Sequence, residues 1–164
     1  MTVPDAPPFS LRPATSEDAE DIATIWHRGW IDGHLGHVPE ALIAHRRASD
    51  FRGRVPPRLP ATTVATLDSR VVGFVTVHDD EIEQLYVAES ARGSGVAAAL
   101  LRRGEKVISA HYPLAWLAVA VGNARARRFY VRQGWIDAAH LDYAAETRSG
   151  PISVPCRRYE KRLS

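Results

Sequence analysis

A mixed α/β fold, with a mixed sheet and helices on both of its faces, is predicted for this chain of 164 residues. Two observations predict it. Amphipathic helical patterns alternate with β-rich runs in the order strand, helix, helix, three strands, helix, strand, helix, strands. The length also suits one domain with a substantial buried core. We therefore expect a single domain over residues 10–164, preceded by a loose leader at residues 1–9 that contains three prolines.

The chain is expected to begin with a short strand at residues 10–13 and a helix at residues 15–33. The start of this helix resembles a capping box, because Thr15 is followed three residues later by Asp18. Apolar residues then recur at helical spacing as far as Trp30. A glycine at the end of this pattern is the expected stop.

A second helix is expected at residues 39–51. Three prolines in residues 54–60 predict a linker or an extended segment after it. From residue 62 the hydrophobic period changes from helical to β, and short polar connections separate the runs. The strands expected here cover residues 62–67, 71–78 and 81–87.

The second half of the chain alternates helix and strand. A helix is expected at residues 94–110, and the apolar run at residues 114–121 predicts a buried central strand. Asn123 is a good N-cap and Gly134 a good stop for the next helix. The tail is less regular, and a closing hairpin around residues 148–151 is expected to pair residues 152–154 with residues 157–163.

Composition excludes several classes of protein. A net charge of +2, evenly spread, does not indicate a nucleic-acid partner. No apolar run approaches the roughly 20 residues that span a bilayer, and neither a membrane partner nor a signal peptide is expected. The single Cys156 fits a reducing cytoplasm, and no Cys/His spacing indicates a metal site. A homodimer is one of the assemblies left open.

A glycine-rich turn joins the strand at residues 81–87 to the following helix. Its residues, Arg92 to Ala97, allow close approach of the backbone, and the helix N-terminus favours a phosphate group. One alternative is a tight turn without a ligand. Another is a dinucleotide site, because Gly93 to Ala98 satisfies G-x-G-x-x-A. The acidic residue that such a site needs about 20 positions later is absent.

Two motifs resemble those of the GNAT-type N-acetyltransferase superfamily. Leu85-Tyr86-Val87 is followed, after four residues, by a turn that is similar to the acyl-CoA signature R/Q-x-x-G-x-G/A. The segment from Asn123 to Trp135 is similar to N-x-x-A-x-x-F-Y-x-x-x-G-F. Two positions depart from the usual pattern, since Glu89 replaces a common proline and Trp135 replaces phenylalanine.

The resemblance implies a GNAT-like acyl-CoA N-acyltransferase fold over roughly residues 10–162 and acetyl-CoA as cosubstrate, without a metal. Backbone amides of the turn would bind the pyrophosphate, and amides of the preceding strand would bind the pantetheine arm. Asn123 is equally well explained as an N-cap, and Arg125 as a solvated side chain. The candidate cofactor-binding residues are Leu85, Tyr86, Val87, Arg92, Gly93, Ser94, Gly95, Val96, Ala97, Asn123, Arg125 and Phe129.

Acetyl transfer to an amine needs a neutral nucleophile and protonation of the departing thiolate. The resemblance places the acid at Tyr130, which could instead be a core residue. Glu83 and, after it, Glu81 are the candidate bases, because they alternate onto one strand face, which we expect to be shared with Leu85 and Val87. A solvated strand edge is the alternative for both glutamates.

The acceptor pocket is expected between the first two helices and the last hairpin. Trp30 and His34, four residues apart on one helix, could line it or belong to the core. The predicted function is therefore direct transfer of the acetyl group of acetyl-CoA to a primary amine of a small molecule or peptide. A non-catalytic acyl-CoA-binding module of the same fold is the alternative.

Overall fold

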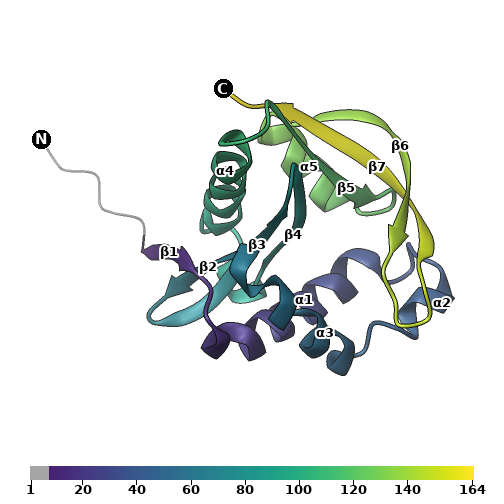
Figure 1. The fold of residues 1–164 in the computed structure, drawn as a ribbon, viewed down its shortest axis with the longest axis horizontal. Coiled ribbons are helices and arrows are strands. Elements are labelled where there is room, and N and C mark those ends of the chain that lie inside the picture. The colour runs from purple at the N-terminus through teal and green to yellow at the C-terminus, as the bar shows by residue number, and fades with distance from the viewer. Residues whose placement is uncertain (1–7) are drawn as a thin grey trace, which may run out of the picture.

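The computed structural model describes residues 8–164, and its fold is one mixed sheet with helices on both faces (Figure 1). Neighbouring strands are antiparallel except for β4 and β5, which are parallel. The predicted fold class is confirmed. The sheet order is β1-β2-β3-β4-β5-β7-β6, and the strands are β1 (Phe9–Pro13), β2 (Thr62–Leu67), β3 (Arg70–His78), β4 (Glu81–Val87), β5 (Leu114–Ala120), β6 (Ile136–Ala145) and β7 (Ile152–Arg162).

Two hydrophobic clusters, one on each face of the sheet, form the core. One contains Leu100 and Ile108 of α4 and Tyr130 of α5. The other contains Trp26 of α1 and Phe51 of α3. α1 and α4 therefore each bury one apolar stripe against the sheet, as amphipathic spacing predicts. The helices are α1 (Ala19–His34), α2 (Glu40–Ile43), α3 (Ala48–Arg54), α4 (Val96–Ser109) and α5 (Ala124–Arg132).

The capping box predicted before α1 is present. Asp18 accepts a hydrogen bond from the Thr15 backbone amide at 2.8 Å and two from the Arg12 guanidinium at 2.7 and 2.9 Å. A turn of 3-10 helix (Ser16–Asp18) leads from this cap into α1. The bond from Arg12 holds the pKa of the Asp18 carboxyl at about 2, below its ordinary value of 3.8.

Asp18→Asn is expected to lower the free energy of unfolding by about 1 kcal/mol at pH 7, the usual cost of losing a cap. The pKa of Asp18 is 3.8 in the unfolded chain and about 2 in the folded protein. The contribution of Asp18 to folding stability is therefore complete above pH 3.8 and is lost as the pH falls from 3.8 to about 2. Urea unfolding at pH 7 and pH 3 measures the difference between the two proteins. A difference of equal size at both pH values would contradict this account.

The helix predicted at residues 39–51 is broken into α2 and α3. The break follows from Asp50, whose carboxylate accepts the backbone N–H of Arg47 at 2.8 Å and so starts a new helix. The prolines after α3 also form a 3-10 helix (Pro56–Ala61), where a linker or an extended segment was predicted. Proline fits such a turn because its φ angle is already close to the helical value.

The hairpin predicted in the tail is present, but its predicted pairing is wrong. Residues 152–154 and 157–162 belong to one strand, β7, which pairs with β6. Leu163 lies just beyond the end of β7. Small and charged residues make β6 a weak strand by propensity, and pairing with β7 overrides that weakness. The leader expected at residues 1–9 lies mostly outside the described residues, and β1 already begins at Phe9.

Candidate active site

β4 and β5 meet at only one point and then separate. Glu81 pairs with Trp116, and the Trp116 amide donates to the Asp80 carbonyl at 3.0 Å. Beyond this point no pairing between β4 and β5 is found within residues 8–164. Figure 1 shows the two halves of the sheet diverging here. The separation leaves backbone groups of β4 near Leu85 and Val87 free to bind a ligand.

The glycine-rich turn leads from β4 into α4 as predicted. Gly93 and Gly95 have φ angles of +78° and +88°, and a Cβ on either would meet no atom within 4 Å. Residues 92–95 are exposed, whereas Val96 is buried against the core. An Arg92–Asp32 ion pair at 2.9 Å ties the turn to α1, and a cavity of about 440 Å³ lies beside it. This open turn at the N-terminus of a 14-residue helix suits a phosphate group.

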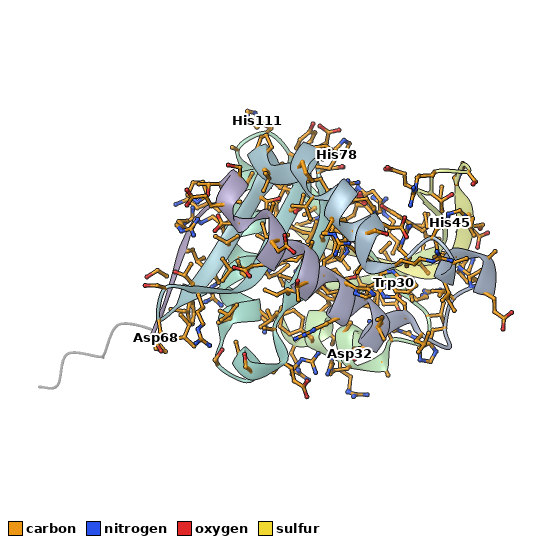
Figure 2. All side chains as sticks on the ribbon, turned by 90° about the horizontal axis from the view of Figure 1, so that it is seen from below. Trp30, Asp32, His45, Asp68, His78 and His111 are labelled. Carbon is orange, nitrogen blue, oxygen red and sulfur yellow. The ribbon has the colours of Figure 1, made fainter. Side chains whose placement is uncertain are left out.

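A second cavity, the acceptor cavity, lies between the α1–α3 layer, β4 and the β6–β7 hairpin. Its volume is about 200 Å³. In Figure 2, α1 crosses in front of the sheet, and Trp30 lies on its C-terminal half. The structure brings together five residues singled out in the sequence. They are Trp30, His34, Glu81, Glu83 and Tyr86, and they share the cavity wall with Arg46, Arg54, Arg58, Tyr143, Glu146 and Cys156.

Glu81 and Glu83 face the same cavity, but they do not share a face with Leu85 and Val87, so this part of the prediction is wrong. Leu85 and Val87 pack on the opposite, α4-side cluster. The reason is a bulge in β4: Thr76 pairs with Gln84 and Val77 with Ile82, so that Glu83 has no partner of its own in β3. The extra residue reverses the alternation of side chains along the strand.

The two glutamates have different surroundings. Glu83 accepts a hydrogen bond from Arg58 at 2.5 Å and is thereby ion-paired. Glu81 is only 7% exposed and accepts a hydrogen bond from the Tyr143 hydroxyl at 3.2 Å. Burial raises the pKa of Glu81, although the bond from Tyr143 opposes the shift. The Glu81 carboxylate therefore has a raised affinity for a proton.

Trp30 and His34 stack with a centroid distance of 5.1 Å and an angle of 8° between their rings. The His34 ring nitrogen Nδ1 lies 3.0 Å from the Trp30 carbonyl oxygen. Burial lowers the pKa of His34 to about 4, so the imidazole is neutral at pH 7. Together the two rings form a flat, uncharged wall of the acceptor cavity.

Tyr130 lies outside the acceptor cavity, on the other face of the sheet. It is 9% exposed, and the rings of Phe129, Trp135 and Tyr159 surround it. Burial raises its pKa, with a smaller contribution from Tyr86, which lines the cavity. Its phenol therefore keeps its proton at pH 7, as an acid must.

The other α5 residues have more ordinary surroundings. Asn123 is the N-cap, since its side-chain oxygen accepts the Ala126 amide at 3.3 Å. Arg125 is exposed, and Phe129 packs against the α4-side core. Cys156 lines the acceptor cavity, and burial raises the pKa of its thiol to about 11. A thiol that stays protonated at pH 7 is a poor nucleophile.

Sequence reasoning missed the polar residues that surround the two glutamates. Arg46, Arg54 and Arg58 reach the cavity from the α2–α3 region, and Tyr143 and Glu146 reach it from the last hairpin. The chain is rich in arginine, and nothing in the local pattern separates these three from solvated ones. Tyr143 was missed because β6 was not recognised as a strand.

Comparison with known proteins agrees with this geometry. The family described as "Acetyltransferase (GNAT) family" matches residues 20–135. An uncharacterized N-acetyltransferase of Archaeoglobus fulgidus is 26% identical over 138 residues, which cover 76% of this chain and 91% of that protein. The chain belongs to the GNAT acetyltransferase family, and it is an acetyl-CoA-dependent acyltransferase.

Solved structures share the fold over nearly the whole chain. A GCN5-related N-acetyltransferase from Rhodopseudomonas palustris superposes with a TM-score of 0.74 at 24% identity, covering 99% of both chains. The PaiA N-acetyltransferase of Thermoplasma acidophilum, solved in complex with coenzyme A, has a TM-score of 0.69 at 17% identity. It covers 94% of this chain and 99% of that one.

Proposed function

We propose that this chain transfers the acetyl group of acetyl-CoA directly to a primary amine of a small molecule or peptide. One observation carries the proposal. β4 separates from β5 immediately after Glu81, so that the strand edge for the donor and the carboxylates of the acceptor cavity lie on the same short strand. Donor and acceptor can then meet without crossing the core.

The donor side is formed by the glycine-rich turn and the free edge of β4. The amides of Gly93, Gly95 and Ala97 are expected to bind the pyrophosphate at the N-terminus of α4. Backbone groups between Leu85 and Val87 would hydrogen-bond the pantetheine arm and polarise the thioester carbonyl. The structure of the Thermoplasma protein with coenzyme A supports a cofactor site in this fold.

The catalytic groups act at opposite ends of the transferred bond. An alkyl ammonium of pKa about 10.4 must lose a proton before it can attack. Glu81 takes this proton directly or through a water molecule, the C–N bond forms, and the C–S bond breaks. Tyr130 then donates its phenolic proton to the departing thiolate, and the second proton that the nitrogen loses as the amide forms restores the phenol. Glu83 has a supporting role, because its ion pair positions Arg58.

Release of free thiol from acetyl-CoA, followed over a panel of primary amines, tests the proposal. We expect release that depends on the amine, together with a product heavier by one acetyl group in mass spectrometry. Tight binding of coenzyme A without thiol release from any amine would instead indicate the non-catalytic binding module.

Gly95→Ala is expected to weaken binding of coenzyme A about 10-fold, because a non-glycine residue at positive φ costs about 1–2 kcal/mol. The strain arises in the backbone, since space for the Cβ is open. Gly53→Ala is the matched control, because Gly53 is helical and its Cβ position is also open. Calorimetric titration with coenzyme A measures both variants, and equal affinities for the two would refute the pyrophosphate assignment.

A further inference from the structure

Three arginines and three glutamates line the acceptor cavity, and among residues 8–164 only one of these arginines, Arg58, is ion-paired. Arg58 is paired with Glu83, and the Glu146 carboxylate lies 3.5 Å from Arg58 with 70% of its side chain exposed. Among residues 8–164, no carboxylate lies within 4.0 Å of the guanidinium of Arg46 or Arg54. Neither cation is therefore ion-paired, although Arg46 is buried and Arg54 is half-buried.

Two hydrogen bonds hold the Arg46 guanidinium in place, but they do not use all of its N–H groups. It is 6% exposed, and it donates to the backbone carbonyls of His45 at 3.1 Å and Glu146 at 2.7 Å. Within the described part of the chain, its buried Nε has no hydrogen-bond partner. The carbonyl bonds fix the guanidinium against the tip of the β6–β7 hairpin and leave the Nε–H without an acceptor.

Arg54 has an aromatic contact in place of an acceptor. Its guanidinium lies 4.4 Å from the centre of the Trp26 ring, and its buried Nε has no partner within residues 8–164. Stacking on a ring stabilises the cation but does not accept its N–H groups. Burial lowers the pKa of Arg54 to about 10, and the charges of Arg46 and Arg58 add to this shift.

A buried cation beside a half-buried one, neither of them ion-paired, is costly, and an anion that binds both removes much of that cost. The planar guanidinium fork matches a carboxylate with two parallel hydrogen bonds. Carboxylates of the protein lie on the β4 side of the same cavity, where Glu81 faces the end of the strand pairing. Glu81 is not ion-paired within the described residues, so the cavity lining presents both an unpaired carboxylate and unpaired guanidinium groups.

We propose that the acceptor is a small amino carboxylate, whose carboxylate binds Arg46 and Arg54 while its amine faces Glu81. This inference rests on the proposed function, since it identifies the class of amine that occupies the same cavity. The volume of about 200 Å³ fits a single amino acid rather than a protein segment. His34 and Trp30 supply an uncharged wall for its carbon skeleton.

Leucine, leucinamide and isoamylamine share the isobutyl group and the amine, but only leucine carries a carboxylate, so their kcat/KM values test the proposal. We expect leucine to be preferred by about 10- to 100-fold, the value of a charge-assisted hydrogen-bonded pair. Comparison of kcat/KM for phosphoethanolamine and ethanolamine tests for a preference for phosphate. A preference for phosphoethanolamine would overturn the carboxylate assignment. Equal turnover of leucine and the two uncharged analogues would also overturn it, while leaving the acetyltransferase function intact.

Arg54→Gln should lower kcat/KM for leucine at least 10-fold more than that for isoamylamine, and Arg54→Lys should lower it less. Arg52→Gln is the control, because Arg52 is an exposed neighbour on the same helix. An equal loss for both substrates in Arg54→Gln would contradict the proposal. Calorimetric binding of leucine against leucinamide gives a readout without turnover. Leucine binding that Arg54→Gln abolishes supports the acceptor class even if no thiol is released.

Discussion

Glu81→Gln is expected to lower kcat/KM for an accepted amine by about 100- to 10,000-fold, the usual contribution of a general base. Glutamine keeps the shape and can still bond Tyr143, so the fold should survive. Glu20→Gln, an exposed change on α1, is the control. Steady-state kinetics with the thiol-release assay measure the effect. A larger loss in Glu83→Gln than in Glu81→Gln would move the base to Glu83.

The pH profile gives this assignment an independent test. Burial raises the pKa of Glu81 above its ordinary value of 4.5, and the base acts only when deprotonated. In the wild type, kcat/KM therefore falls as the pH is lowered through that raised pKa. Glu81→Gln should lack this step and keep only the titration of the amine. An unchanged step in the variant would exclude Glu81 as its source.

Tyr130→Phe is expected to reduce kcat by about 100-fold, because protonation of the thiolate by a positioned acid is lost. Within residues 8–164 the Tyr130 hydroxyl makes no side-chain hydrogen bond to another residue, so its removal should leave stability nearly unchanged. The ring contacts with Trp135 and Tyr159 remain in the variant. Thermal unfolding checks the fold, and kinetics at saturating acetyl-CoA measure kcat.

An exposed tyrosine offers the matched control for this change. Tyr112 is 37% exposed, and Tyr112→Phe should alter neither kcat nor thermal stability. If Tyr130→Phe turns over an accepted amine at the wild-type rate, Tyr130 is not the acid. The presence of a tyrosine at position 130 would then be explained by its packing in the aromatic cluster alone.

Local sequence signals were sufficient for the parts of the fold that depend on neighbouring residues. The strand–turn–helix from β4 to α4 and the N-cap at Asn123 are set by glycine and capping chemistry over a few positions. The capping box at Thr15 and Asp18 is of the same kind. Each of these predictions depended on residues that lie a few positions apart in the sequence and contact each other in the folded structure.

Features that depend on distant contacts were not predictable. The bulge at Glu83 exists only in the register of β4 against β3, and it reverses the face that simple alternation assigns. Arg46 is buried because the β6–β7 hairpin folds over it, about 100 residues later in the chain. β6 itself is held by pairing with β7 rather than by its own propensity. The acceptor cavity combines all three, so its two glutamates on β4 were predicted but its arginines and Tyr143 were missed.

A crystal structure of the protein with coenzyme A tests the central claim most directly. We expect the pyrophosphate on the amides of Gly93, Gly95 and Ala97, and the arm along the free edge of β4. The thiol should then lie where β4 leaves β5, between the Tyr130 hydroxyl and the opening of the cavity that holds Glu81. A thiol that lies away from this junction, with no path to Glu81, would contradict the account.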